Sequence, residues 1–292
     1  MNRKHDYDRS FFDKIDTEEK AYVLGLIYAD GCNVKHPTTG ELSITQIERD
    51  VDILYKVKEA IKSTYPIIEQ KNYLGGDGKS FEFYIYGKQL KEQLDKLGVV
   101  HNKSLVLSFP TFISDDLMPH FIRGYFDGDG SVWNGKRKKM VVKNDYRPGE
   151  YRERIVHNVK FNFTGSNTFI PFLQDYLVEK YGFTKTKLNY SKAKNDHRHC
   201  MMEYSGRKNL YKLYDIMYSS ATIYGERKKA KFEEILCALS EKSLSEMGLI
   251  AGTPETVTSS EAEKSERSTT IPEMEVGGSP SKCPTLSEQC RR

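Results

Sequence analysis

The sequence predicts an α+β fold in which one arrangement of helices and strands occurs twice. Segments whose apolar residues recur every three to four positions predict helices, and segments that alternate between apolar and polar residues predict strands. In both halves of the chain helical and strand segments alternate in the same order, with a helix at the beginning, in the middle and at the end. Each half begins with an apolar helix that ends in Asp-Gly, at Asp30 and again at Asp129. This internal similarity indicates two related units in tandem.

The first half begins with a helix whose two ends are marked in the sequence. Asp16, followed three residues later by Glu19, is typical of a capping box at a helix start. Gly31 is expected as the C′ residue that stops the same helix. The predicted elements are a helix over Ala21–Ala29, a strand over Glu41–Ile47, a helix over Val51–Ser63, a strand over Phe81–Tyr86 and a helix over Lys88–Leu97.

The second half repeats this order after a linker that runs from about Leu97 to Ser114. Pro119 suits the first turn of its opening helix, and Gly130 is expected to stop that helix as Gly31 stops the first. The predicted elements are a helix over Phe121–Gly128, strands over Val132–Val142 and Ile155–Phe163, a helix over Thr168–Tyr181, strands over Lys185–Ser191 and Met201–Tyr204, and a helix over Lys208–Met217.

The last fifty residues differ in composition from the rest of the chain. Residues 252–292 are rich in Ser, Thr, Pro, Glu and Gly, and residues 241–292 contain no Phe, Tyr or Trp. Such a segment cannot bury enough apolar surface to offset its ordering entropy. We therefore expect an N-terminal extension (1–16), a first unit (17–110), a second unit (111–240) and a disordered tail (241–292).

The net charge also differs between the tail and the rest. The 292-residue chain has a formal net charge of +4. From Glu241 onward there are six Lys/Arg and nine Asp/Glu, which leaves 39 basic and 32 acidic residues, a net charge of +7, in the part before it. A basic body predicts a polyanionic partner such as nucleic acid, although a merely soluble basic surface would have the same composition.

Neither the cysteines nor the apolar residues indicate export or a membrane. The five cysteines are scattered and none forms a CxxC pair, so neither a disulfide framework nor a zinc site is expected. No apolar run approaches 18 residues, and the first ten residues are polar and charged, so we expect no membrane span and no signal peptide. Scattered cysteines without a disulfide framework predict a reducing compartment, either the cytoplasm or an organelle matrix.

The two Asp-Gly helices share a nine-residue motif. It reads Val-Leu-Gly-Leu-Ile-Tyr-Ala-Asp-Gly over Val23–Gly31 and Ile-Arg-Gly-Tyr-Phe-Asp-Gly-Asp-Gly over Ile122–Gly130. Small residues recur four positions apart in each copy and therefore lie on one helical face. Because glycine inside a helix costs roughly 1 kcal/mol relative to alanine, this face predicts two helices that pack closely against each other. The small residues are Gly25 and Ala29 in the first helix and Gly124 and Gly128 in the second.

Packed in this way, the helices would bring Asp30 and Asp129 together. Both lie at a helix C-terminus, where the macrodipole is negative and a carboxylate is unfavourable. Two like charges at one point, beside the terminal carbonyl groups, need a counter-charge. Oxygen ligands without a cluster of Cys or His favour Mg²⁺. Two carboxylates that share divalent ions are the arrangement used for in-line phosphodiester hydrolysis.

Two simpler interpretations of the motif are weaker. Asp-Gly alone is common in turns, so one such helix would indicate little. The segment Asp127-Gly-Asp129-Gly-Ser131 also resembles the start of an EF-hand loop. That loop needs Gly where Val132 stands and Glu where Lys138 stands. Two copies separated by 99 residues, about one small domain, favour the paired site.

The two motifs resemble the LAGLIDADG pair that gives a homing endonuclease family its name. The resemblance covers about Thr17 to Phe232 and includes phrases of the linker such as Leu97-Gly-Val-Val-His-Asn-Lys-Ser and Phe109-Pro. It implies a monomer with internal pseudo-two-fold symmetry, built from two αββαββα units with the motif helices at the interface and a β-sheet saddle for double-stranded DNA. It also implies Mg²⁺-dependent double-strand cleavage at a long asymmetric target, with two or three divalent ions shared between the motifs.

The resemblance implies roles for residues around each acid. The family's catalytic acids map onto Asp30 and Asp129, and the neighbouring carbonyl groups of Ala29 and Gly128 are expected at the metal site. Motif 1 departs from the pattern at its sixth position, where Tyr28 replaces the acid that Asp127 keeps in motif 2. That position is not a metal ligand in the family, so the departure does not put the expected activity in doubt.

A basic and a polar residue are expected beside each acid. The lysines are Lys103 and Lys228, where an ammonium would stabilise charge at the scissile phosphate or hold a water. The alternative to this role is that both are ordinary surface lysines. The polar residues are Gln46 and Asn162, each at the end of a strand before a helix, and each would position the attacking water or simply cap the strand end.

Two basic stretches of the predicted sheets form the expected DNA-binding surface. A long hairpin that turns at Pro148-Gly149 would fit a duplex groove, and a second basic ribbon follows it. A run of charge is usually a solvated face, but both stretches belong to the sheets that flank the acids. Trp133 is expected either beside this surface or in the core. The expected contacts are Asn134, Lys136, Arg137, Lys138, Lys143, Arg152, Arg154, Lys185, Lys187, Asn189 and Lys192.

Three other functions share some of these features. An intron RNA maturase, which is a splicing factor, would bind intron RNA and would need neither acid. A DNA-binding regulator that no longer cuts would have no use for Asp30 and Asp129, which the chain retains. An intein would begin with Cys or Ser and end after a His-Asn pair. This chain begins with Met1, so a free-standing or intron-encoded protein is favoured.

Overall fold

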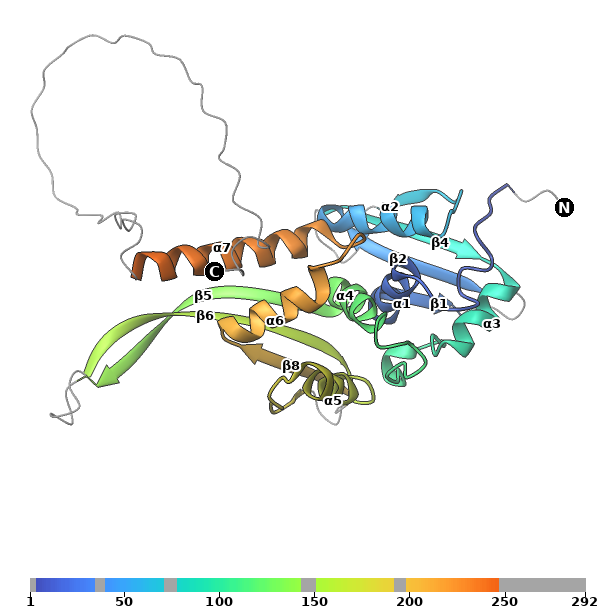
Figure 1. The fold of residues 1–292 in the computed structure, drawn as a ribbon. Helices are drawn as coiled ribbons and strands as arrows, with labels where there is room; N and C mark the ends of the chain where they lie inside the picture. The colour runs from blue at the N-terminus through green and yellow to red at the C-terminus, as the bar shows by residue number, and fades with distance from the viewer. Residues whose placement is uncertain (1–3, 35–39, 71–77, 143–150, 192–197, 247–292) are drawn as a thin grey trace, which may run out of the picture. The chain divides into compact units, whose positions relative to one another are not determined.

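Two four-stranded antiparallel sheets, each with its own helices, organise the described residues. The computed structural model describes residues 4–34, 40–70, 78–142, 151–191 and 198–246, and all of them belong to a unit that spans residues 1–251. Helices and strands alternate along the chain, which confirms the predicted α+β class (Figure 1). Two predicted DNA contacts, Lys143 and Lys192, lie outside the described residues, as does the predicted tail from Met247 onward.

In the first half, a helix leads directly into a four-stranded sheet. The strands are ordered β1-β2-β4-β3, and every neighbouring pair is antiparallel. A 3₁₀ turn, η1 (Glu48–Asp50), connects β2 to α2. The elements are α1 (Glu18–Asp30), β1 (Gly31–Val34), β2 (Glu41–Ile47), α2 (Val51–Ala60), β3 (Ile67–Gln70), β4 (Ser80–Tyr86) and α3 (Lys88–Lys96).

The second half has the same topology, which confirms the predicted repeat. Its sheet is ordered β5-β6-β8-β7, again antiparallel throughout. The 3₁₀ turn η3 (Lys103–Leu105) precedes it, and Pro119 lies in the first turn of α4 as predicted. The elements are α4 (Met118–Asp129), β5 (Gly130–Val142), β6 (Tyr151–Ser166), α5 (Ile170–Tyr181), β7 (Asn189–Tyr190), β8 (His199–Ser205), α6 (Arg207–Tyr218) and α7 (Glu226–Glu246).

Three of these elements were not among those predicted. Strands β1 and β3 have four residues each, too few for an alternating pattern to stand out. Helix α7 has 21 residues and continues past residue 240, where the tail was expected to begin. Its sequence does carry a helical signal, because its buried apolar residues recur at helical spacing: Phe232, Ile235, Leu236 and Leu239.

The start of α1 differs from the predicted capping box. The N-cap is Thr17, which has an extended backbone (φ −133°) and accepts a hydrogen bond from Lys20 N at 3.3 Å through its hydroxyl. Asp16 lies one residue too early to cap the helix. Its carboxylate instead accepts from Lys20 Nζ at 2.8 Å, which is an i, i+4 ion pair.

The ends of α1 and α4 also differ from the predicted left-handed stops. Gly31 and Gly130 have φ values of −72° and −91° and extended ψ values, so each helix passes straight into a strand. Glycine is needed there for space. A Cβ atom would lie 2.7 Å from Ile27 Cγ2 at the first position and 2.2 Å from the Phe126 ring at the second.

Helices α1 and α4 pack backbone to backbone, as the small-residue pattern predicts. A Cβ atom added to Gly25 would lie 2.0 Å from Phe121 O, and one added to Gly124 would lie 2.0 Å from Tyr22 O. At Gly128 the added atom would lie 2.3 Å from the Ala29 Cβ. The predicted interface of Gly25, Ala29, Gly124 and Gly128 is therefore confirmed.

The other helices cover one face of each sheet. Helices α2 and α3 pack on the first sheet, and α5 and α6 pack on the second (Figure 1). The predicted N-terminal extension is part of this packing, because Tyr7, Phe11 and Phe12 are buried in the core and Gln93 of α3 donates to Arg9 O at 2.7 Å. Within the described part of the chain, no helix is both long and apolar enough to span a bilayer.

We predict that Gly25→Ala destabilises the fold far more than a glycine-to-alanine substitution at an open position. The new methyl group would meet the main-chain oxygen of Phe121, which cannot move without shifting α4. Overpacking of this kind lowers the free energy of unfolding by roughly 1–3 kcal/mol or more, measurable by chemical denaturation. Gly78→Ala is the control, because nothing lies within 4 Å of its added Cβ. Equal stability of the two variants would contradict the close helix contact.

Candidate active site

The C-terminal ends of α1 and α4 bring two carboxylates to one point. The helices end at Asp30 and Asp129, respectively, and Asp30 Oδ2 lies 3.0 Å from the position of a Cβ atom added to Gly128. Burial, together with the charge of Asp30, raises the pKa of Asp129 to about 6. Burial also raises the pKa of Asp30. The concentration of negative charge expected from the motifs is therefore present.

Lys103 and Lys228 each place an ammonium group at the end of one motif helix. These helix ends carry carbonyl groups without partners inside the helix and the negative pole of the dipole. A cation is favourable there for both reasons. Each ammonium donates two hydrogen bonds of 2.7 or 2.8 Å to carbonyl oxygens of the last turn: Lys103 to Tyr28 and Ala29, and Lys228 to Phe126 and Gly128.

Both lysines are buried next to the carboxylates. Lys103 is 5% exposed and Lys228 is 8% exposed, so the alternative of ordinary surface lysines is wrong. Burial lowers the pKa of both ammonium groups. Asp129 and Asp30 oppose that shift at Lys103, while Asp127 and Asp30 oppose it at Lys228. Each lysine is therefore bonded to one helix and faces a carboxylate of the other.

Gln46 lies beside Asp30, where it was expected. Its side-chain amide, at the end of β2, donates to Asp30 Oδ2 at 2.5 Å, and this bond lowers the pKa of Asp30 against the effect of burial. A second pair beside it was not foreseen. Arg227 donates to both oxygens of Asp50, at 2.6 and 2.9 Å, and so fixes the start of α7 on the first half.

The predicted counterpart of Gln46 in the second half, Asn162, does not occupy the equivalent place. The glycine after each motif aspartate pairs with Ile44 in the first half and with Phe163 in the second. Gln46 stands two residues after Ile44, so its equivalent is Gly165, two residues after Phe163. Asn162 stands one residue before Phe163 and therefore projects from the other face of the sheet.

The sixth position of each motif anchors the segment that carries the lysine. Tyr28 Oη donates to Leu97 O at 2.5 Å, at the start of the connection that leads to the first lysine. Asp127 accepts from Gly225 N at 2.6 Å, three residues before the second lysine. The departure of motif 1 from the family pattern is thus explained. Tyr28 as a hydrogen-bond donor and Asp127 as an acceptor hold the lysine-bearing segments of the two halves in the same way.

Asp127 is enclosed by donors from three elements. Besides the Gly225 amide, the Tyr22 hydroxyl of α1 donates to it at 2.8 Å and the Tyr218 hydroxyl of α6 at 3.4 Å. Burial nevertheless raises its pKa to about 6, against the hydrogen bond from Gly225 and the charge of Lys228. This carboxylate therefore ties the α6–α7 connection to both motif helices.

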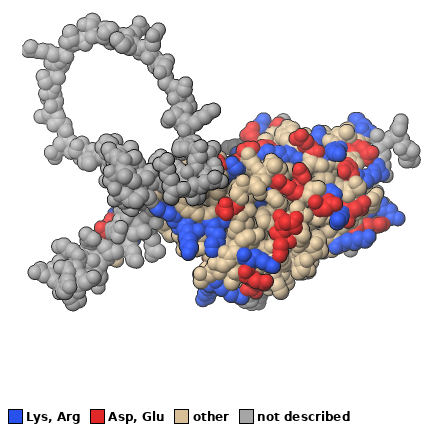
Figure 2. Space-filling model, viewed as in Figure 1, with Lys and Arg blue, Asp and Glu red and all other residues tan. Residues whose placement is uncertain are grey.

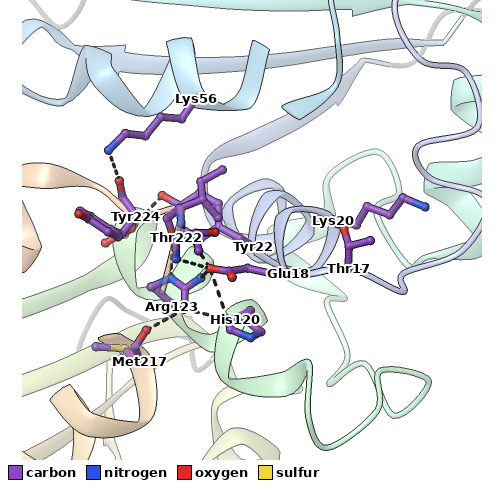
Figure 3. A network of polar contacts seen from close by, with 12 residues as sticks. Thr17, Glu18, Lys20, Tyr22, Lys56, His120, Arg123, Met217, Thr222 and Tyr224 are labelled. Carbon is purple, nitrogen blue, oxygen red and sulfur yellow. Dashed lines mark hydrogen bonds and ion pairs between the residues drawn. The ribbon is translucent and has the colours of Figure 1, made fainter. Parts of the chain in front are cut away.

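A second network secures the same connection from the other side (Figure 3). The Glu18 carboxylate, at the start of α1, accepts from Arg123 Nη2 at 2.6 Å and from Thr222 N at 2.7 Å. Arg123, which is fully buried, also donates to Met217 O at 2.7 Å and to Ile223 O at 2.8 Å. A buried charge of this kind is stable only when its donors are used, so the loop before α7 has a fixed position.

The oxygen atoms around the carboxylate pair are of the kind that coordinates magnesium. Among the described residues, no group of three or more His, Cys, Asp or Glu is placed to hold a metal. Asp30 and Asp129 supply two carboxylates. The carbonyl oxygens of Ala29 and Gly128 each accept one lysine hydrogen bond and keep a second lone pair. Mg²⁺ is commonly bound by one or two carboxylates together with substrate phosphate oxygens and water, so this set fits it.

The face of the second sheet that lies opposite its helices carries polar and aromatic side chains. Trp133 is 49% exposed, so its alternative placement in the core is wrong. Its indole lies over Gly135, where an added Cβ would be 2.0 Å from the ring. Across the strands it pairs with Lys160, which forms an ion pair of 2.6 Å with Glu203. Asn162 lies on this face too, by the same alternation.

The predicted DNA contacts of the long hairpin do not all lie on the same face of the sheet. Asn134 pairs with buried Val159 and so belongs to the helix-covered side of the sheet, a correction that follows from strand alternation. Lys138 is exposed and pairs with Glu153 at 2.8 Å. Four others occupy positions in the paired strands, but their side chains lie outside the description: Lys136, Arg137, Arg152 and Arg154.

The predicted second basic ribbon is largely absent as a strand. Among the described residues 185–191, only β7, which is two residues long and contains Asn189, is a strand. Lys185 lies before it and forms an ion pair of 2.5 Å with Asp175 of α5, so it points toward the helix side. Lys187 is exposed in the same irregular segment. On the face seen in Figure 2, the described part of the chain exposes both basic and acidic side chains.

Comparison with curated proteins gives one partial relative. No protein-family model matches the chain. The DNA-directed RNA polymerase subunit Rpo1C of Methanocaldococcus jannaschii is 29% identical over 147 residues, which are 49% of this chain and 15% of that protein. The chain therefore spans a small part of the curated relative that it matches.

Solved structures match a larger part of the chain. Meganuclease I-SmaMI bound to uncleavable DNA with a TTGT central four has a TM-score of 0.51 at 15% identity, over 79% of this chain and 92% of that one. I-AabMI bound to uncleaved DNA has a TM-score of 0.49 at 15% identity, over 78% and 92%. I-LtrWI bound to target DNA has a TM-score of 0.48 at 14% identity, over 78% and 92%. At these identities the likeness to I-SmaMI, a LAGLIDADG homing endonuclease, concerns the fold.

We predict that Tyr28→Phe lowers the thermal stability of the protein. The change leaves the buried Leu97 carbonyl without its donor, which costs about 1–3 kcal/mol, and it loosens the connection to Lys103. Tyr55→Phe is the matched control, because Tyr55 is 58% exposed on α2. If both variants unfold at the temperature of the wild type, in calorimetry or circular dichroism, the anchoring role of the sixth position is wrong.

Proposed function

We propose that this chain, which has the fold of the LAGLIDADG homing endonucleases, cuts both strands of double-stranded DNA at a specific site. The observation that carries the proposal is the pair of carboxylates, Asp30 and Asp129, at the ends of the two motif helices, each accompanied by a buried lysine. A protein that only bound DNA would have no need for two carboxylates held together against their repulsion. Because both motifs are in one chain and the halves differ in sequence, we propose a monomer and a long asymmetric target.

The carboxylate pair would hold Mg²⁺, which supplies charge neutralisation at the phosphate and an activated water. The residues of the chain orient the groups around it. Gln46 fixes the rotamer of Asp30 through its amide. Lys103 and Lys228 each use two of three N–H groups on helix carbonyls. The third N–H is left to stabilise negative charge that develops on the scissile phosphate of one strand.

The two sheets would supply the DNA-binding surface. Trp133, Lys160 and Asn162 lie on the face of the second sheet opposite its helices, with a mixture of donors, charge and an aromatic ring. Cationic side chains there would mainly contact phosphates and position the duplex, while Asn and Arg at alternating strand positions would read base edges. We propose that Arg137, Arg152 and Arg154 of the hairpin contact the duplex.

We predict that Asp30→Asn and Asp129→Asn each abolish double-strand cleavage while DNA binding is retained. Each change removes one negative ligand of the shared ion without removing volume. The measurement is Mg²⁺-dependent linearisation of a plasmid library with randomised targets, followed by sequencing of the cut ends. Binding of the recovered target is measured by gel shift, and chelation of Mg²⁺ should stop wild-type cleavage.

Asp215→Asn, on the exposed surface of α6, is the control and should cut like the wild type. Undiminished cleavage by the double variant with both motif aspartates replaced would contradict the proposed site. Binding of intron RNA with rescue of splicing by that double variant, without DNA cleavage by the wild type, would indicate a maturase instead.

We predict that replacing three hairpin arginines by alanine weakens DNA binding and its salt dependence. In Arg137→Ala/Arg152→Ala/Arg154→Ala, each lost phosphate contact should reduce the slope of log K against log salt by about 0.9. Lys14→Ala/Lys96→Ala/Lys208→Ala is the control with the same loss of charge, at exposed positions outside the sheets. The same slope for both triple variants would show that the hairpin does not contact the duplex.

A further inference from the structure

The strands of the two sheets differ in charge. The four strands of the first sheet contain no Lys or Arg and three Glu, whereas those of the second contain seven Lys or Arg and two Glu. The hairpin connections do not remove this difference. With residues 35–40 and 71–79 included, the first sheet has three Lys against four Asp or Glu. With residues 143–150 and 191–198 included, the second sheet has twelve Lys or Arg against five Asp or Glu.

The face of the first sheet opposite its helices carries uncharged polar groups and a carboxylate. Phe83 of β4 is buried in the core, so Glu82 and Tyr84, on either side of it in the strand, lie on the opposite face. Across the strands, Thr45 of β2 pairs with Glu82, and Ser43 pairs with Tyr84. This face therefore offers hydrogen-bonding groups to a ligand, while its strands supply no cation for a phosphate.

The Glu82 carboxylate has a fixed orientation. Gln70 of β3 donates to its Oε2 atom at 3.0 Å, and both side chains are half-buried. Within the described part of the chain, no Lys or Arg forms an ion pair with Glu82. A carboxylate oxygen can accept more than one hydrogen bond, so Oε1 can accept from a ligand while Oε2 is held by the amide.

We propose that the two sheets divide the recognition of DNA: the second sheet makes most of the phosphate contacts, and the first reads bases, with Glu82 accepting a hydrogen bond from the amino group of a cytosine. That amino group is the donor that a carboxylate recognises in the major groove, whereas guanine presents only acceptors at the same edge. The proposal rests on the proposed function, because it needs a duplex that lies on both sheets. It goes beyond that function in assigning affinity and base preference to different halves of the protein.

The position of Glu82 along its strand indicates which part of the target it reads. Glu82 pairs with Thr45, the residue before Gln46, and Gln46 donates to Asp30. Tyr84 lies two residues farther from this end of the sheet. The cytosine should therefore lie close to the centre of the target, where the strands are cut, rather than at its outer end.

The first test measures base preference. A library of randomised targets is cut by the wild type and by Glu82→Gln, and the cut ends are sequenced. The wild type should prefer cytosine at one position near the centre of one half-site. Glu82→Gln should lower that preference about 5-fold or more, as expected for loss of one base contact, and leave the other positions unchanged.

Glu69→Gln is the matched control, because it makes the same change on the other face of the same sheet. Glu69 pairs with Phe81, which packs against the core, and its carboxylate forms an ion pair of 3.2 Å with Lys79. This variant should keep the base preferences of the wild type. An unchanged cytosine preference in Glu82→Gln, or the same loss in Glu69→Gln, would overturn the role of Glu82.

The second test locates the phosphate contacts by ethylation interference on the same target. Ethylation removes the charge of one phosphate at a time, and the positions that weaken binding mark the contacts that contribute affinity. Outside the central positions, these should lie mainly in the half-site whose base preferences Glu82→Gln leaves unchanged. Equal numbers of interfering phosphates in the two half-sites would overturn the division between the sheets.

Binding measurements separate this proposal from the proposed cleavage. If the wild type cuts no DNA with any divalent ion, the nuclease function fails. The target is then recovered from the same library by selecting bound duplexes without metal, and both tests proceed by gel shift. A selected target without the cytosine preference would overturn the role of Glu82, whether or not the protein cuts DNA.

Discussion

The backbone contact between α1 and α4 is the constraint on which the rest of the structure depends. At Gly25 and Gly124 each helix approaches a carbonyl oxygen of the other so closely that a Cβ atom would lie 2.0 Å from it. This approach alone brings Asp30 and Asp129 to one point. The same helices also form the centre of the core, since every residue of α1 from Ala21 to Tyr28 is buried. Stability and the proposed chemistry therefore depend on one surface, and a substitution in it changes both.

A pair of carboxylates at two helix C-termini is electrostatically unfavourable, and the fold offsets this with cations from distant segments. Lys103 follows the first half and Lys228 follows the second, so neither cation is close in sequence to the helix whose carbonyls it binds. Long connections lose entropy when they are fixed, and the sixth motif positions, Tyr28 and Asp127, hold them in place. Each motif thus contains both an acid and, at its sixth position, the residue that fixes the segment carrying the lysine beside that helix.

The sequence predicted the features that depend on local pattern and on the motif. The two acids and the glycine interface lie where they were expected, because spacing within a helix determines them. Lys103, Lys228 and Gln46 were expected from the resemblance to the family, and all three lie beside the ends of the motif helices. The error at Asn162 has a different origin. Its relation to Gln46 depends on which residue pairs with the glycine after each motif, and a shift of one residue in a strand reverses its face. Pairing register is a long-range property, so the sequence of one strand does not contain it.

The position of the second half that is equivalent to Gln46, Gly165, is constrained by its packing against Tyr125. A tyrosine at position 125 together with any side chain at 165 would collide, because their atoms would lie 2.2 Å apart. Tyr125 and Gly165 are therefore a coupled pair, and the effects of substitutions at the two positions on stability should not add independently. The difference between the half-sites at this strand position is therefore a property of packing as well as of chemistry.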